Sequence, residues 1–447
     1  MEKNLTSGSV FKTIIYFALP YLLSYFLQTL YGMADLFIIG QFGGVDGITA
    51  VANGSQVMHM LTVIIVGLAM GAMVTIGRAV GAKKLDDAAA AIGNTITLFM
   101  MVAVVITVLL VASVSPIVTL IGTPQEAIAG TGWYLTICFL GIPFITAYNI
   151  ISSIFRGLGD SKSPMYFIAV ACAANIALDY LFIGGMGLGA AGAALGTTLA
   201  QTFSVCVALV AIRKRQTGIH LKKQDFRPSR EVMGQILKIG LPVAVQDGCI
   251  QVAFMIITVI ANHRGLDDAA AVGIVEKVIS AIFIVPSSML ATVSTLSAQN
   301  IGAGKHERAA QTLRYATIIT GSYGLIVTGV VLFGAESVLR WFTADATVIL
   351  LGSQYIRGYI WDSIFAGVHF SFTGYFCAYG RSYIGFIHNI LAIVLVRVPG
   401  SYLASRYFPD TLLPMGLAAP AGSLLSVIIC LGAYLWMKKR GLLQNGG

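Results

Sequence analysis

The sequence predicts an all-α membrane protein with twelve transmembrane helices in two pseudo-symmetric lobes of six helices each. Three observations support this fold class. Of the 447 residues, 57% are hydrophobic and only 11% are charged, against about 25% charged in an ordinary soluble domain. Twelve apolar segments are long enough to cross a bilayer, and the two halves of the chain match each other at a constant spacing.

The apolar segments are continuous rather than alternately apolar and polar, which favours helices over a closed barrel. A hydrocarbon core of about 30 Å is crossed by about 20 residues of helix. We place the segment boundaries where charged residues or Gly and Pro interrupt the apolar sequence. The segments are then residues 14–40, 48–76, 88–113, 128–150, 164–185, 188–211, 236–262, 269–299, 309–333, 349–372, 382–407 and 413–438.

The net charge of +9 follows the membrane topology and does not indicate a nucleic-acid partner. Most of the 28 Lys and Arg residues fall on one side of the twelve segments; the exceptions are Arg264, Arg340, Arg357, Arg397, Arg406 and Lys277. Because positive loops face the cytoplasm, both termini are predicted to be cytoplasmic. The basic residues between 213 and 230 then form a cytoplasmic linker that faces anionic lipid.

The two halves repeat one design at a spacing of 221 residues. The matched pairs include Gly81 with Gly302, Lys84 with Lys305, Phe155 with Phe376 and Gly159 with Gly380, while Leu19-Pro20 meets Leu241-Pro242 one residue out of step. Each half has an even number of spans, so an axis along the membrane normal relates them. We therefore expect an N-terminal lobe at 1–211, a cytoplasmic basic linker at 212–235 and a C-terminal lobe at 236–447. Such lobes can enclose a cavity that opens to either face as they rock.

Two carboxylates lie at membrane depth without a neighbouring Lys or Arg: Asp35 and Asp179. An ionisable group there costs about 2.5–3.5 kcal/mol on insertion scales, so it marks a binding function. Asn175 and Asp179 are four residues apart and share one helix face. If Asp35 approaches that face, desolvation and like charge favour a bound proton, which an entering sodium ion or organic amine would displace. This competition is the chemistry of an antiporter.

Pro20 lies in the same predicted helix as Asp35. It removes a backbone hydrogen bond and invites a kink, and protonation of Asp35 could select between two bends. An equal alternative is that Pro20 only marks the start of the helix.

The second lobe has intramembrane candidates of its own: Asp247, Gln251, Glu276, Asp362, His369 and His388. At the repeat spacing Asn175 meets Val396 and Asp179 meets Gly400, so the polar site is expected in the N-terminal lobe. Glu276 and Lys277 can neutralise each other, and helix ends can hold Asp247 or Asp362 near a headgroup.

Enzyme motifs do not fit the chain. His306-Glu307 lacks the second His of a zinc-protease helix. Gly157-Leu-Gly-Asp160 resembles the GxGD signature of intramembrane aspartyl proteases, but its repeat mate ends in Arg381. A phosphate-binding loop is absent from the sequence. We expect no enzyme activity and no cofactor, and an H+ or Na+ gradient as the energy source.

Over nearly its whole length the chain resembles the multidrug and toxic compound extrusion (MATE) family. The matching residues are Leu19-Pro20, Tyr31, Asp35, Ala82-Lys83-Lys84, Phe155 through Asp160, Asn175 through Ile183 and Gly187 through Gly192. The resemblance implies two six-helix lobes in a V around a central cleft. It also implies export of mostly cationic amphiphiles against proton or sodium entry.

The resemblance is closest to the branch whose N-terminal lobe supplies the coupling acids. It implies Asp35, Asn175 and Asp179 as the coupling site, with Na+ as one candidate ion, and Pro20 as the bending point. Its implied polar neighbours are Tyr31, Tyr134, Asn149 and Thr197. Another branch binds sodium through second-lobe acids, including a glutamate on the seventh helix, where this chain has Gln251. Asp247 and Asp362 remain possible substitutes, so the coupling ion stays open.

These expectations describe a monomeric antiporter of the cytoplasmic membrane. Its partners would be small organic cations or amphiphiles and the lipid bilayer. One alternative is a lipid-linked sugar flippase of related architecture, which needs a cationic cavity and is disfavoured by the few cations inside the spans. A membrane-embedded enzyme is a weaker alternative, because its motifs are missing.

Overall fold

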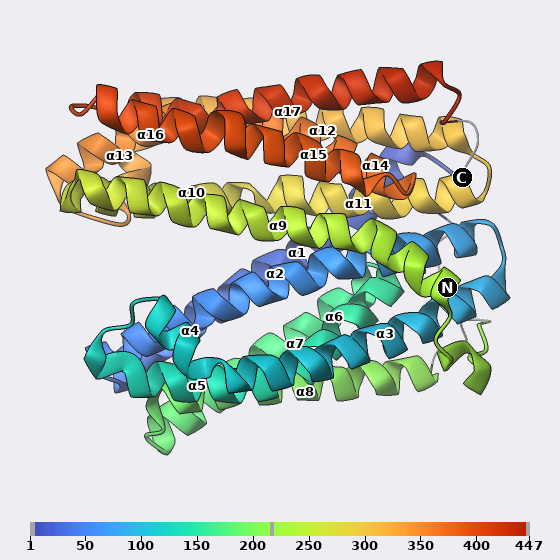
Figure 1. Ribbon diagram of the computed structural model, residues 1–447, viewed down its shortest axis with the longest axis horizontal. Helices are drawn as coiled ribbons and strands as arrows, with labels where there is room; N and C mark the ends of the chain where they lie inside the picture. The colour runs from blue at the N-terminus through green and yellow to red at the C-terminus, as the bar shows by residue number, and fades with distance from the viewer. Residues whose placement is uncertain (1–4, 215–218, 444–447) are drawn as a thin grey trace. The chain divides into compact units, whose positions relative to one another are not determined.

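The computed structural model describes residues 5–214 and 219–443, in which every secondary-structure element is a helix (Figure 1). The outermost terminal residues, whose cytoplasmic location is predicted, lie outside the described residues. So do residues 215–218 of the predicted linker. The fold class expected from the apolar segments, an all-α membrane protein, is confirmed.

The chain divides into two compact units that exchange the beginnings of two long helices. The first unit comprises Leu19–Gly240, and the second comprises Leu5–Ala18 together with the chain from Leu241 onwards. Helices α1 (Val10–Phe42) and α9 (Arg230–Arg264) therefore each run through both units. They change unit next to Pro20 and Pro242, where the missing proline N–H removes one helical hydrogen bond and makes a bend easier.

The first unit is completed by helices that follow α1. In chain order they are α2 (Val45–Gly81), α3 (Leu85–Ala112), α4 (Val114–Leu120), η1 (Gln125–Ala127), α5 (Ile128–Leu140), α6 (Ile142–Gly157), α7 (Lys162–Asp179), η2 (Tyr180–Gly185), α8 (Gly189–Lys214) and η3 (Lys223–Phe226). The most extensive packing joins α7 to α8, α2 to α6 and α5 to α8.

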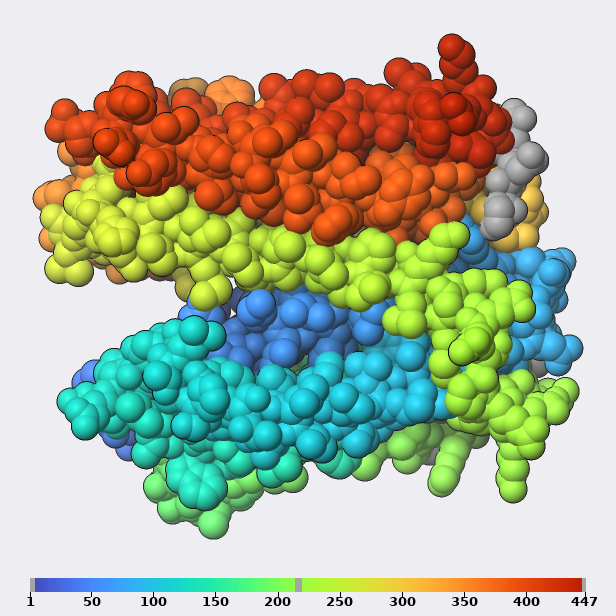
Figure 2. Space-filling view, in the orientation of Figure 1, coloured from blue at the N-terminus to red at the C-terminus, as the bar shows by residue number. Residues whose placement is uncertain are grey.

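The second unit is completed by helices that follow α9. In chain order they are α10 (Leu266–Ile282), α11 (Ile284–Gly302), α12 (His306–Arg340), α13 (Ala346–Tyr359), α14 (Asp362–Ala378), α15 (Ser382–Ala392), η4 (Ile393–Arg397), α16 (Val398–Tyr407) and α17 (Leu413–Lys439). Helix α14 lies at the centre and packs on α11, α12 and α17. Figure 2 shows α15 and α16, which follow each other along one span, lying alongside α17 on one face of this unit.

Ten helices of the described chain are each long and apolar enough to cross a membrane. Residues 125–140 and 142–157, bent by 51° at Gly141, pass the same test together and bring the number to eleven when the bent pair is counted as one span. The tenth predicted segment, 349–372, is divided between α13 and α14, with the interruption at Ile360–Trp361. The two interruptions lie at matching positions of the repeat, so the duplication extends to the backbone.

The segment before α1 is anchored to α12 within the second unit. Leu5 is 1% exposed. Lys305 Nζ donates to the Thr6 carbonyl at 2.7 Å, and Arg308 donates to the carbonyls of Ser7 and Gly8 at 2.8 and 2.7 Å. Hydrogen bonds from charged donors are stronger than neutral ones, so the start of α1 is held firmly to this unit.

The segment before α9 is anchored to α3 within the first unit. The Asn94 amide donates to the Asp225 carbonyl at 3.1 Å and its oxygen accepts from the Ser229 N–H at 2.7 Å. Thr97 donates to the Phe226 carbonyl at 2.8 Å. Because α3 and α12 are repeat mates, each exchanged helix begins from a segment anchored to the corresponding helix of its own unit.

Candidate ion-coupling site

Helices α1 and α7 bring together the three polar residues that the sequence singled out in the first lobe. Asp35 comes from the second half of α1, and Asn175 and Asp179 come from adjacent turns at the end of α7. Asp35 is 4% exposed, and Asn175 and Asp179 are fully buried. Asp35, Asn175 and Asp179 lie close enough for each to influence the others electrostatically.

This cluster has many more hydrogen-bond acceptor oxygens than donor groups. Thr197 Oγ1 of α8 donates to Asp35 Oδ2 at 3.2 Å. Asp35 Oδ1, both oxygens of Asp179 and the amide of Asn175 have no well-aligned partner among the described residues. Nor does an ion pair join either carboxylate to a Lys or Arg in that part of the chain. Buried polar groups in a native protein are normally paired, so the cluster is suited to receive a proton or a cation.

Gly196 of α8 creates the space for Asp179. A Cβ atom at this position would lie 2.1 Å from Asp179 Oδ1. Any larger residue therefore forces the carboxylate away from the α8 backbone. The glycine-rich stretch around 196 indicates close helix packing from sequence alone, but not that a carboxylate fills the gap.

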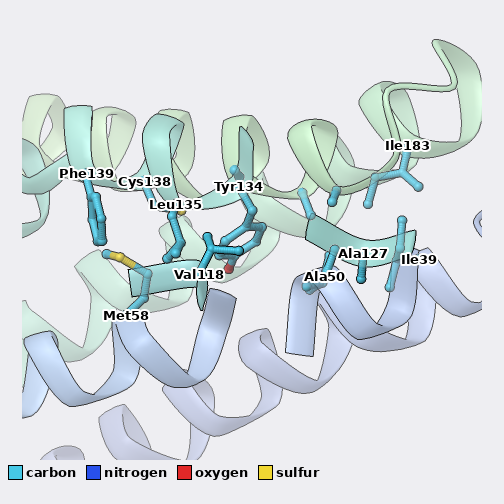
Figure 3. Close-up of a cluster of buried hydrophobic side chains, with 14 of the residues drawn as sticks. Ile39, Ala50, Met58, Val118, Ala127, Tyr134, Leu135, Cys138, Phe139 and Ile183 are labelled. Atoms are coloured by element: carbon cyan, nitrogen blue, oxygen red, sulfur yellow. The ribbon is translucent and has the colours of Figure 1, made fainter. Parts of the chain in front are cut away.

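Tyr31 and Tyr134 border the cluster. Tyr31 of α1 interacts with Thr197 and Gln201 of α8, and the charge of Asp35 acts on both tyrosines. Figure 3 shows Tyr134 in the buried apolar cluster together with Leu135, Cys138 and Phe139 of α5. The expected neighbours Tyr31, Tyr134 and Thr197 thus lie at the carboxylates. Gln201 and Cys138 were not expected; Gln201 lies one helical turn from Thr197, which is the signal that could have identified it.

Asn149, the remaining expected neighbour, lines a different cavity. This cavity of about 20 Å³ is enclosed by residues of α1, α2 and α6: Tyr21, Ser24, Tyr25, Gln28, Val66, Tyr148, Asn149 and Arg156. Arg156 donates to the Tyr21 hydroxyl at 3.1 Å and lies over the Tyr21 ring. Gln28, which lines the same cavity as Asn149, is two helical turns before Asp35 on α1. Asn149 therefore lies at a different site from the carboxylate cluster.

Asp160 of the GxGD-like sequence is a helix cap. Its Oδ1 accepts the backbone N–H groups of Lys162 and Ser163 at 2.9 and 3.1 Å, and its Oδ2 accepts the Ser163 hydroxyl at 2.6 Å. Both oxygens thus bind the first turn of α7, which is the usual role of an aspartate at this position.

The second-lobe candidates do not form one cluster. Asp247 interacts with its neighbour Gln246, and Gln251 lies partly exposed on α9. Glu276 accepts from Thr258 at 3.4 Å, and the charge of Arg397 acts on it more strongly than that of the adjacent Lys277.

Asp362 and His369 line a cavity of about 50 Å³ that Arg397 also lines. His388 lies behind it, with its Nε2 3.0 Å from the Thr373 hydroxyl. Arg397 was not a candidate from sequence, although an arginine well inside the predicted span 382–407 is the signal that could have identified it.

The described residues contain no group of three or more His, Cys, Asp or Glu side chains that could hold a metal ion. Two carboxylates and an amide oxygen are nevertheless ligand types that suit a hard monovalent cation. The unpartnered oxygens of Asp35, Asn175 and Asp179 fit such an ion as transported cargo.

Comparisons with known proteins agree with this architecture. A probable multidrug resistance protein of Bacillus subtilis, YoeA, is 27% identical over 97% of this chain and 95% of its own length. The probable multidrug resistance protein NorM of Thermotoga maritima is 25% identical over 89% of this chain and 86% of its own length. A crystal structure of MATE in complex with MaL6 superimposes with a TM-score of 0.90 at 21% identity, covering 99% of each chain.

The MatE family model matches the chain twice, over residues 20–181 and 242–403. The two matches begin at Pro20 and Pro242 and end at Leu181 and Leu403, which confirms the internal repeat. The family resemblance found in the sequence is also confirmed. This multi-pass membrane protein therefore belongs to the MatE family, whose members are transporters rather than enzymes.

Proposed function

We propose that the protein is a secondary active exporter in which the Asp35–Asp179 pair couples the entry of H+ or Na+ to the exit of an organic compound. The observation that supports this most is a pair of buried carboxylates with unpartnered oxygens and no ion pair to a basic residue among the described residues. Two such groups repel each other unless a proton or a cation lies between them.

Coupling follows from exclusive occupancy of that space. A proton shared by the two carboxylates, or a sodium ion bound by them with Asn175, removes the repulsion. An organic cation that approaches the same carboxylates removes it too, so binding of one favours release of the other. Tyr31, Tyr134 and Thr197 would hold the carboxylates in position. Asp35 and Pro20 belong to one helix that runs through both units, so a change of charge at Asp35 would be transmitted through α1 to the second unit.

The proposal also covers the substrate class and the location. Relatives named as multidrug resistance or export proteins suggest amphiphilic organic cations. Their bacterial sources suggest the plasma membrane, with the basic linker and both termini on the cytoplasmic side. A lipid-linked sugar flippase would need a cationic binding cavity for its pyrophosphate, which a pair of buried acids opposes.

The test is efflux of a fluorescent organic cation from vesicles that contain the purified protein, driven separately by a pH gradient and by a sodium gradient. Asp35→Asn and Asp179→Asn should each reduce gradient-driven efflux to the level of empty vesicles. Asp247→Asn, which removes another intramembrane acid, should retain it. All three proteins should elute as folded species in size-exclusion chromatography. Full efflux by both site variants contradicts the site, and absence of efflux by the unmodified protein under both gradients contradicts the function.

A further inference from the structure

The second unit contains a cavity of about 50 Å³ that is lined by both apolar and polar side chains. Among its lining residues are Asp362 of α14, Arg397 of η4, His369, Asn389, Ser423 and Phe254. The volume accommodates a few water molecules, but it is much smaller than an organic substrate. The cavity therefore has room for water molecules or a small ion such as Na+.

Arg397 is fixed in this cavity by aromatic side chains. Its guanidinium donates to the Tyr359 hydroxyl and lies 4.7 Å from the centre of the Phe254 ring and 5.5 Å from that of Tyr359. It is the last residue of the π-helical segment η4, a type of helix distortion that is frequent at functional sites. These contacts hold one permanent positive charge inside the unit.

Two carboxylates act on that charge, those of Asp362 and Glu276. Asp362 is 1% exposed, and its oxygens have no well-aligned hydrogen-bond donor among the described residues; Arg397 Nε is likewise unpartnered there. Asp362 and Arg397 line the same cavity, but no ion pair joins them among the described residues, and Glu276 is not part of the lining. In a poorly polarisable interior the attraction between opposite charges extends over several ångströms.

The repeat gives an independent comparison. At the spacing of 221 residues Arg397 corresponds to Ile176, the residue next to Asn175. The second unit thus has an arginine beside the position at which the first unit has its carboxylate site. In the described parts of the chain, no basic residue forms an ion pair with Asp35 or Asp179.

We propose that Arg397 is a built-in counter-ion for Asp362, with which it shares the cavity, and that it takes the place that an exchangeable cation would take at Asp35 and Asp179. Because the guanidinium is covalently part of the chain, it cannot leave when a substrate arrives. Asp362 is thereby removed from ion coupling. This inference concerns a separate site and stands whether or not the first-unit pair drives transport.

The test uses the full-length protein carrying Asp35→Asn and Asp179→Asn, so that the first-unit site is silent. Thermal unfolding in detergent is followed at one alkaline pH while Na+ replaces choline at constant ionic strength. Adding Arg397→Gln should lower the half-saturating Na+ concentration for stabilisation by at least about tenfold, because one positive charge has left the cavity. Asp362→Asn on top of Arg397→Gln should abolish that gain. Arg397→Lys, which keeps a tethered charge, should behave like arginine.

A gain that persists without Asp362, or no gain at all in Arg397→Gln, overturns the proposal. If Arg397→Gln does not fold, the same titration is made with Arg397 present, comparing the first-unit double variant with and without Asp362→Asn. The two Na+ responses should then coincide. A sodium stabilisation that Asp362→Asn removes while Arg397 is in place shows that Asp362 already binds exchangeable cations, and it also overturns the proposal.

Discussion

The two units share a duplicated backbone but treat their buried acids in opposite ways. In the first unit Asp35 and Asp179 meet without an ion-paired base among the described residues. In the second unit Asp362 shares a cavity with Arg397, although the described residues form no ion pair there. A permanent basic neighbour compensates the negative charge of an acid. A pair of acids without such a neighbour is stabilised by a bound proton or cation. Under the roles proposed above, a duplicated fold separates a site for exchange from a site for internal stability.

The backbone features common to both units have local causes. Each unit exchanges the beginning of one helix at a Leu-Pro sequence, Leu19-Pro20 or Leu241-Pro242, and each interrupts one span at a matching position. Side chains at corresponding positions diverged without disturbing these features. Symmetry of the fold therefore does not imply symmetry of the chemistry.

The largest expected effect comes from giving the first unit a tethered cation like that of the second. Thr197→Lys places an ammonium group beside Asp35, whose Oδ2 now accepts from the Thr197 hydroxyl at 3.2 Å. Since the attached charge cannot leave, gradient-driven efflux should fall by at least about a hundredfold. The matched control is Thr197→Val, which removes one hydrogen bond worth about 1 kcal/mol and should reduce efflux by no more than about fivefold. Vesicle efflux measures both, and equal rates for the two variants would refute the role of charge exchange.

A smaller loss is expected from moving one carboxylate without changing any charge. In Gly196→Ala the new methyl group would lie 2.1 Å from Asp179 Oδ1, so the carboxylate has to turn away from α8. We expect efflux to fall about tenfold, since a displacement of about 1 Å can cost this much or more. Gly132→Ala on α5 is the control, because its Cβ would meet nothing within 4 Å. The unfolding temperatures of the two variants should be similar; unchanged efflux in Gly196→Ala would show that the position of Asp179 is not critical.

The smallest expected effect is a difference in the free energy of unfolding between variants of Asp160 and of its repeat mate Arg381. Asp160 caps α7, whereas Arg381 at the start of α15 provides no side-chain cap. Asp160→Ala should therefore lower the free energy of unfolding by about 1 kcal/mol, and Arg381→Ala should change it much less. Efflux per folded molecule should be retained in both. Loss of efflux in a stable Asp160→Ala protein would instead assign Asp160 a role in transport.

Much of the first-unit site could be predicted because its signals are local. A charged residue in an apolar span is visible without a structure, and the spacing of Asn175 and Asp179 places both on one helix face. Tyr31 and Thr197 followed from family resemblance. Asn149 shows the limit of that approach, since it lines the cavity of Tyr21 and Arg156 rather than the carboxylates.

Other features depended on contacts between distant segments. Nothing local in the sequence shows that Gly196 gives space to Asp179, or that Arg397 acts on Asp362 and Glu276 more directly than the adjacent Lys277 acts on Glu276. The predicted span 349–372 looks continuous in composition, yet the helix is interrupted at Ile360–Trp361.

The sequence by itself determined the membrane location, the number and approximate place of the spans, the duplication and the identity of the acids in the first unit. These depend on composition and spacing along the chain, and hydrophobic burial depends on both. Only the tertiary structure decided which acids share a space, which have a basic partner and which helices run through both units. Those properties depend on distances between side chains far apart in sequence, because charge interactions in a poorly polarisable interior change steeply over a few ångströms.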